Sequence, residues 1–134
     1  MKRRVVLVTA LLGGISSGSQ AHHSFAMFDQ QKTVIITGTV RKFEWTNPHV
    51  WLELVGDDGE PKWGLEGGPP SILARSGFAK DLLTPGMKIS VTINPLKNGS
   101  HGGSLLRVTL PDGRVLNSDP NAISNTGATA PGDK

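Results

Sequence analysis

Residues 34–55 have the sequence VIITGTVRKFEWTNPHVWLELV, in which apolar and polar residues alternate in two separate runs. Alternation with β-branched residues predicts a strand in each run, because successive side chains of a strand point to opposite faces. The apolar phase slips near Arg41 and Lys42, which predicts a bulge or a sharp bend at that point. The turn sequence TNP separates the first strand from a second one at residues 49–55.

Four further strands and one short helix are expected in the rest of the chain, with Gly- and Pro-rich turns between them. In chain order they are a strand at residues 62–66, a helix at 71–76, strands at 88–94 and 105–110, and a short return strand at 114–116. Three strands, a helix and two strands is the element order of an OB-type barrel. We therefore expect an all-β fold with one short helix, a small OB-like barrel of five to six strands. A small β-sandwich is the alternative.

The alternating positions also predict which side chains fill the barrel. Each strand should turn one apolar face inward, and a closed barrel buries that face completely. The expected inward set is Val34, Ile36, Val40, Val50, Leu52, Leu54, Trp63, Leu65, Ile89, Val91, Ile93, Leu106, Val108 and Leu110.

The first 21 residues have the pattern of an export signal. Lys2, Arg3 and Arg4 are positively charged, residues 5–15 are apolar, and a small, polar stretch ends at Ala21. This pattern predicts cleavage after Ala21. A membrane anchor is the alternative, but a spanning helix needs about 20 apolar residues and this apolar run is shorter.

Four regions follow from these patterns. They are a signal peptide at residues 1–21, a mature N-terminal segment at 22–31, an OB-like β-barrel domain at 32–117 and a tail at 118–134. The tail is expected to be disordered, because Asn, Ser, Thr, Gly, Ala and Pro dominate it. The mature protein is expected in the periplasm or outside the cell, with no membrane span left after cleavage.

Charge and cysteine content exclude several classes of function. The whole chain has 14 Lys and Arg against 11 Asp and Glu, and the leader carries three of the basic residues, so the mature chain has 14 − 3 = 11 of each sign. A nucleic-acid binder needs a basic excess or a basic stripe, so nucleic acid is not expected as a partner. The chain has no Cys, which excludes disulfides and thiolate metal sites.

Cleavage after Ala21 would leave His22 and His23 at the start of the mature chain. An N-terminal His can chelate a metal through its α-amine and an imidazole nitrogen, and His49 from the barrel could complete the site. Nitrogen ligands of this kind favour Cu(II), so copper is the first metal to consider. The alternative is that both histidines belong to a solvated chain end, because adjacent residues of an extended segment point to opposite sides.

A second candidate surface lies around the sequence WTNPHVW, residues 45–51. OB folds commonly bind ligands on strands 2 and 3 and with the loops that join strands 1–2 and 4–5. Trp45, Asn47 and Trp51 could therefore form a surface for a protein, a peptide or a glycan, next to His49. His101, in the second of those loops, is a weaker candidate because a loop histidine is commonly just exposed.

The sequence HHSFAMFD at residues 22–29, the GTV at 38–40 and the W-x-N-P-H motif at 45–49 resemble a family of small exported bacterial proteins of unknown function. The resemblance extends from His22 to about residue 116. It implies export and a shared small β-domain, and it implies no activity or cofactor.

No phosphate-binding loop, nucleophile elbow or paired acid and base appears in the sequence, which favours a non-enzymatic protein. We expect an exported periplasmic binding module that binds a transition metal, copper first, through His22, His23 and His49. The alternatives are the interaction module described above, with an envelope protein as one partner, and an accessory subunit of an envelope enzyme. The sequence leaves the oligomeric state open.

Overall fold

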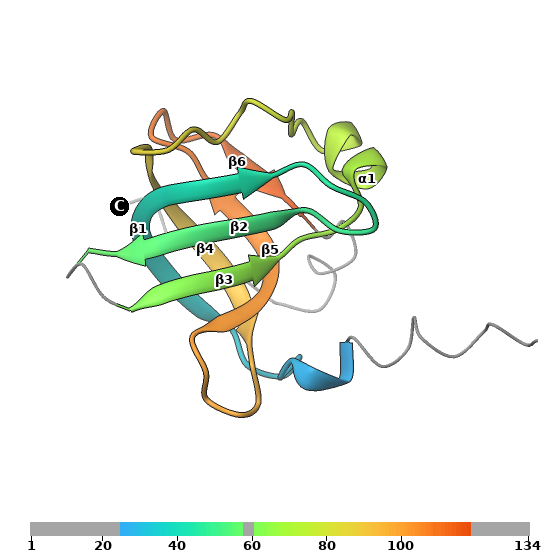
Figure 1. Cartoon of the computed structure of the whole chain (residues 1–134), viewed down its shortest axis with the longest axis vertical. Helices are drawn as coiled ribbons and strands as arrows, with labels where there is room; N and C mark the ends of the chain where they lie inside the picture. Colours follow the sequence, from blue (N-terminus) through green and yellow to red (C-terminus); the bar gives the residue numbers. More distant parts are fainter. Residues whose placement is uncertain (1–24, 58–60, 119–134) are drawn as a thin grey trace, which may run out of the picture.

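Strands make up most of the fold, which was analysed in a computed structural model that describes residues 25–57 and 61–118 (Figure 1). The strands are β1 (Val34–Glu44), β2 (Trp51–Gly56), β3 (Lys62–Glu66), β4 (Lys88–Pro95), β5 (Gly102–Thr109) and β6 (Val115–Asn117). One short helix, α1 (Pro70–Arg75), lies between β3 and β4, and a 3-10 turn, η1 (Phe25–Met27), precedes β1. Helix α1 begins with a proline in its first turn, where the missing N–H costs nothing.

The sheet closes into a barrel of five strands. Its order is β3-β2-β1-β4-β5-β6, and β3 also pairs with β5 in parallel, so that β1 to β5 form a ring and β6 extends β5 outside it. All other strand pairs are antiparallel. This arrangement confirms the predicted small all-β barrel with one short helix. The sandwich alternative is wrong, because a single sheet closes on itself.

The bulge predicted in the first strand is confirmed. Val40 pairs with Leu54 and Lys42 pairs with Glu53, so Arg41 is the extra residue of β1. The extra residue shifts the side-chain alternation by one position. It lets one long strand pair with β4 through its first half and with β2 through its second half.

A second bulge, in β5, overturns one prediction about the core. Thr92 pairs with Arg107 but Ile93 pairs with Leu105, so Leu106 has no partner in the ladder. Leu105 is buried at 1% exposure, and Leu106 is only half-buried. The prediction that Leu106 points inward is therefore wrong, because simple alternation cannot detect an inserted residue.

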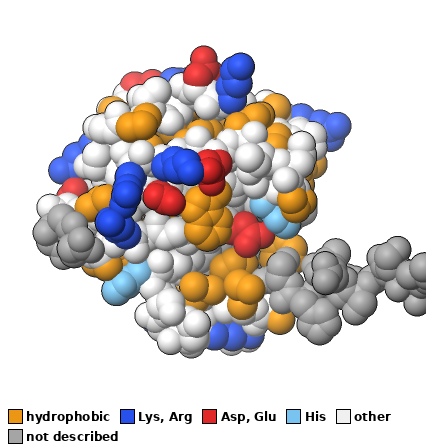
Figure 2. Space-filling model, in the orientation of Figure 1, with side chains coloured by type: hydrophobic (Ala, Val, Ile, Leu, Met, Phe, Trp, Pro, Cys, Tyr) orange, Lys and Arg blue, Asp and Glu red, His pale blue; other side chains and the backbone are white. Residues whose placement is uncertain are grey.

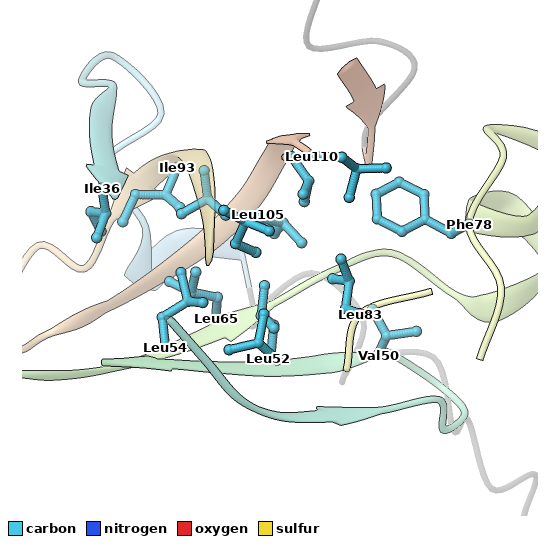
Figure 3. Close-up of a cluster of buried hydrophobic side chains, with 14 of the residues drawn as sticks. Ile36, Val50, Leu52, Leu54, Leu65, Phe78, Leu83, Ile93, Leu105 and Leu110 are labelled. Atoms are coloured by element: carbon cyan, nitrogen blue, oxygen red, sulfur yellow. The ribbon is translucent and has the colours of Figure 1, made fainter. Parts of the chain in front are cut away.

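The core fills the barrel from side to side (Figure 3). Side chains of β2 and β3 face those of β1, β4 and β5, and Phe78 and Leu83 lie at one end. Two predicted core residues, Val34 and Trp63, are partly buried and pack against the core from its edge. The fully buried part of the predicted set is Ile36, Val40, Val50, Leu52, Leu54, Leu65, Ile89, Val91, Ile93, Val108 and Leu110.

Some predictions concern residues at the two ends of the chain. The proposed signal peptide at residues 1–21 and the tail from residue 119 lie outside the described residues. Ser118, expected to begin the tail, is buried at 2% exposure, and its N–H donates to Leu106 O. The barrel domain therefore includes Ser118. No helix within residues 25–57 and 61–118 is long and apolar enough to cross a membrane.

Candidate functional site

The segment before β1 is fixed to the barrel by its backbone. Asp29 N donates to Pro95 O at 2.8 Å, and Lys97 N donates to Met27 O at 2.9 Å. Phe28 forms an isolated bridge with Leu96 between these two hydrogen bonds, and its side chain is 5% exposed. We call residues 25–32 the N-terminal strap.

A buried amide holds the other end of the N-terminal strap. Asn94 Nδ2, on β4, donates to Lys32 O at 2.8 Å, and Asn94 is 9% exposed. The strap is thus attached at both ends to β4 and to the residues that follow it. Its position is set by hydrogen bonds as well as by burial of Phe28.

A cavity of about 330 Å³ lies between the N-terminal strap and one end of the barrel. Its wall comes from the strap, the β1–β2 loop, the end of β3, the turn that follows it, α1, β5 and the residue after β6. The lining residues are Phe25, Phe28, His49, Glu66, Gly67, Gly68, Pro69, Ile72, Ser104, Leu105 and Ser118. The strap therefore shares a cavity with His49, the one barrel histidine predicted as a metal ligand.

His49 and Glu66 form the polar part of this cavity. His49 Nδ1 lies 2.9 Å from Glu66 Oε1, within ion-pair distance, and the side chains are 30% and 23% exposed. The register explains the contact: Trp51 pairs with Glu66, and two backbone hydrogen bonds continue the ladder through Val50 to Gly67 and Gly68. His49 is thereby the diagonal neighbour of Glu66 on the outer face of the sheet, within reach of a long side chain.

This contact with a carboxylate bears on what His49 can do chemically. A neutral imidazole that donates through Nδ1 presents the lone pair of Nε2. Histidines that bind metals commonly donate their other ring N–H to a carboxylate, which fixes the ring and increases its basicity. Figure 2 shows acidic and histidine surface side by side, with hydrophobic surface around them. One nitrogen ligand is thus available at the cavity.

The three residues of the predicted interaction surface, Trp45, Asn47 and Trp51, lie in different environments. Trp45 is half-buried, packs against the core and makes an edge contact with Phe43, with ring centroids 5.9 Å apart. Asn47 is exposed in the β1–β2 loop. Trp51 is 37% exposed and lies on the outer face of β2. None of these three residues lines the cavity beside His49.

His101 lies elsewhere. Its ring makes an edge contact with Trp63, with centroids 4.9 Å apart, and its backbone O accepts a hydrogen bond from Gly64 N. The two histidine surfaces that are visible on this face of the molecule lie far apart (Figure 2). His101 is therefore separate from the cavity that contains His49.

The other predicted metal ligands, His22 and His23, lie outside the described residues. Within residues 25–57 and 61–118, no group of three or more His, Cys, Asp and Glu side chains is arranged to hold a metal ion. The described part of the chain supplies His49, oriented by Glu66. Any further ligands of a metal site at the cavity must come from elsewhere.

Sequence reasoning missed the contact between Glu66 and His49. The position of Glu66 could have been predicted from the hairpin turn. A two-residue turn at Asp58 and Gly59 would fix the antiparallel register, so that each pair of facing residues has numbers that add up to 117. The observed pairs, from Val55–Lys62 to Trp51–Glu66, follow this rule. The apolar side chains of Phe25, Met27 and Phe28 indicate that this segment packs onto the barrel, and of the three Phe28 is buried while Phe25 and Met27 are about half exposed. The alternation of the strands does not predict where the segment packs.

The comparisons with known proteins come from three searches. A family model described as a family of unknown function (DUF6152) matches residues 10–105. The match spans more than half of the chain, and the chain belongs to this family. The search of curated proteins and the search of solved structures found no significant match.

Proposed function

We propose that this member of the DUF6152 family is an exported, non-enzymatic module that binds copper(II). The ligands would be His49 and the histidines that follow the predicted cleavage site, His22 and His23. The observation that carries the proposal is the distance of 2.9 Å between His49 Nδ1 and Glu66 Oε1, at a cavity that Phe25 also lines. This contact presents Nε2 of His49 as a ligand oriented by a carboxylate.

The reach of the chain supports this ligand set. Phe25 lies two positions after His23 and three after His22. An extended chain covers about 3.3–3.6 Å per residue, so two or three residues span roughly 7–11 Å. Phe25 is thus near enough for an N-terminal imidazole to meet His49 at the cavity. Cleavage after Ala21 would add an α-amine, a further nitrogen ligand of the kind Cu(II) favours.

The mature chain starting at His22 should be titrated with Cu(II) in competition with a chromophoric chelator. We expect one equivalent to bind, with nitrogen ligands visible by electron paramagnetic resonance. His49→Ala should weaken binding by about tenfold or more, because one ligand is lost, and an added Ala before His22 should weaken it because the α-amine is displaced. His101→Ala is the matched control and should leave the affinity unchanged.

Two results would contradict the proposal. If His49→Ala binds copper as tightly as the unaltered protein, any metal belongs to the chain terminus alone. If the extended and mature forms bind equally, the α-amine is not a ligand. Glu66→Gln separates orientation from ligation: we expect it to weaken copper binding by roughly 10–100-fold, the usual effect of removing the carboxylate behind a metal-binding His.

The second candidate function is an interaction module for a protein, a peptide or a glycan. The observation that favours it is the exposure of Trp51, whose indole is 37% exposed on the outer face of β2. Large exposed aromatic side chains commonly anchor partners. A partner captured from the periplasm in the presence of a chelator, and lost with Trp51→Ala but not with His49→Ala, would support this function over copper binding.

A further inference from the structure

The cavity under the N-terminal strap has the size and the lining of a small organic ligand site. Natural ligand pockets begin at roughly 300 Å³ and are mostly apolar with a few polar groups. This cavity has a volume of about 330 Å³, and its apolar wall includes Phe28, Ile72 and Leu105. Phe28 is 5% and Leu105 1% exposed, so two of these wall residues belong to the buried part of the fold.

The polar part of the cavity is an acceptor of hydrogen bonds. Glu66 Oε1 lies 2.9 Å from His49 Nδ1. A carboxylate has about four acceptor sites on its two oxygens, so Glu66 can accept further hydrogen bonds. The Ser118 hydroxyl oxygen accepts from Gly68 N at 3.3 Å, which holds the wall of the cavity together.

The charge of the lining residues determines whether a cation or an anion is favoured as the ligand. Among the described residues that line the cavity, Glu66 is the one carboxylate and none is Lys or Arg. Glu66 is also only 23% exposed in its side chain, so its charge is less screened than that of a fully exposed carboxylate. An anion would be repelled there. A cation that also carries an apolar group would satisfy both parts of the lining.

We propose that this cavity binds a small hydrophobic amine as its ammonium ion. The ammonium group donates to the Glu66 carboxylate, and the apolar group contacts Phe28, Ile72 and Leu105. His49 acts as a positioning residue, because its Nδ1 lies against the Glu66 carboxylate. This inference goes beyond the proposed copper function and does not depend on it, since Glu66 is the group that contacts the ligand.

The test uses the mature chain in the presence of a chelator, so that failure of copper binding cannot affect it. The probes are 2-phenylethylammonium and 3-phenylpropanoate, which carry the same ring on a short chain and opposite charges. Calorimetry measures the affinity, and amide chemical shifts locate the site. We expect phenylethylammonium to bind at least about tenfold more tightly than phenylpropanoate, because a hydrogen bond between an ammonium group and a carboxylate is stronger than one between neutral groups.

Three variants locate the interaction. Glu66→Gln keeps the shape but removes the charge, and should weaken phenylethylammonium binding by about tenfold or more. Glu53→Gln is the matched control: Glu53 lies on the outer face of β2, 3.8 Å from Arg41 and away from the cavity lining, and its removal should leave the affinity unchanged. Ile72→Trp keeps the charge, fills the apolar end and should abolish binding.

Each contrary result overturns the proposal. Absence of saturable binding to the unaltered protein means that the cavity is not an amine site. Equal affinity for the two probes, or for Glu66→Gln and the unaltered protein, means that the carboxylate does not select the ligand. Unchanged binding by Ile72→Trp means that the cation is attracted to the surface and does not enter the cavity. Thermal unfolding of each variant establishes that it is folded.

Discussion

The indole of Trp51 lies across Gly64 on the neighbouring strand: a Cβ on Gly64 would be 2.6 Å from Cζ2 of the ring. Gly64→Ala should therefore displace the exposed indole. Because the ring can move into solvent, we expect a cost of only about 1 kcal/mol in unfolding free energy. The emission spectrum of Trp51, in a background with Trp45 and Trp63 replaced by Phe, should change.

Gly103 provides the contrasting case in the same region. A Cβ on Gly103 would be 2.5 Å from Asn94 O and 2.8 Å from Ile93 Cδ1, both on the paired strand β4. Backbone cannot move aside as the Trp51 ring can, so Gly103→Ala should cost about 3 kcal/mol, at the upper end of overpacking effects. Equal denaturation midpoints for the two alanine variants would contradict this account of the two glycines.

Leu105 and Leu106 should respond differently to truncation. Leu105→Ala removes a side chain that is 1% exposed and should cost about 2–5 kcal/mol. Leu106→Ala removes a half-buried side chain at the bulge and should cost about 1 kcal/mol or less. Urea denaturation of both variants measures the difference in unfolding free energy. A greater loss of stability for Leu106→Ala than for Leu105→Ala would contradict the position of the bulge at Leu106.

The two bulges show what the sequence could reveal about the fold. Around Arg41 the apolar phase visibly slips, so the bulge in β1 was predictable. Around Leu106 two adjacent leucines hide the slip, because either one satisfies the alternation. The closed barrel followed from element order alone, but the contact between Glu66 and His49 required the strand register. The apolar side chains of Phe25, Met27 and Phe28 indicated packing onto the barrel, but which of them is buried depends on where distant segments meet.

Asn94 should control the order of the N-terminal strap. Asn94→Ala removes the hydrogen bond from Nδ2 to Lys32 O and should cost about 0.5–1.5 kcal/mol. Hydrogen exchange at Asp29 N–H, which bonds to Pro95 O, should become faster. Asn98→Ala is the control, because its Oδ1 accepts only a local hydrogen bond from Ser100 N, in an exposed loop. Unchanged exchange in Asn94→Ala would show that burial of Phe28 and the backbone hydrogen bonds hold the strap without the amide.

The turn before β6 should make a contribution to stability that depends on pH. The backbone N–H of Arg114 donates to Asp112 Oδ1 and its Nε donates to Oδ2, and these bonds lower the pKa of Asp112 below its usual value of 3.8. A lowered pKa stabilises the fold above the pKa of the unfolded chain, and this stabilisation is lost as pH falls through the folded pKa.

Carbon NMR of the Asp112 carboxyl group measures this effect directly. We expect its titration midpoint below 3.8, and a shift towards that value in Arg114→Ala, where the side-chain donor is lost. The backbone donor remains in Arg114→Ala, so the shift should be partial. A midpoint at or above 3.8 in the unaltered protein would contradict the assignment of these hydrogen bonds.

The barrel closes where β3 and β5 meet, and there the ladder has three residue pairs, Gly64–Gly102, Leu65–Gly103 and Glu66–Ser104. The other four junctions of the barrel have five or six residue pairs each, so this short seam should be the first to open. Glu66, Ser104 and Leu105 also line the cavity. A ligand in the cavity would contact both strands of the seam. Its dissociation rate would then measure how often β3 and β5 separate.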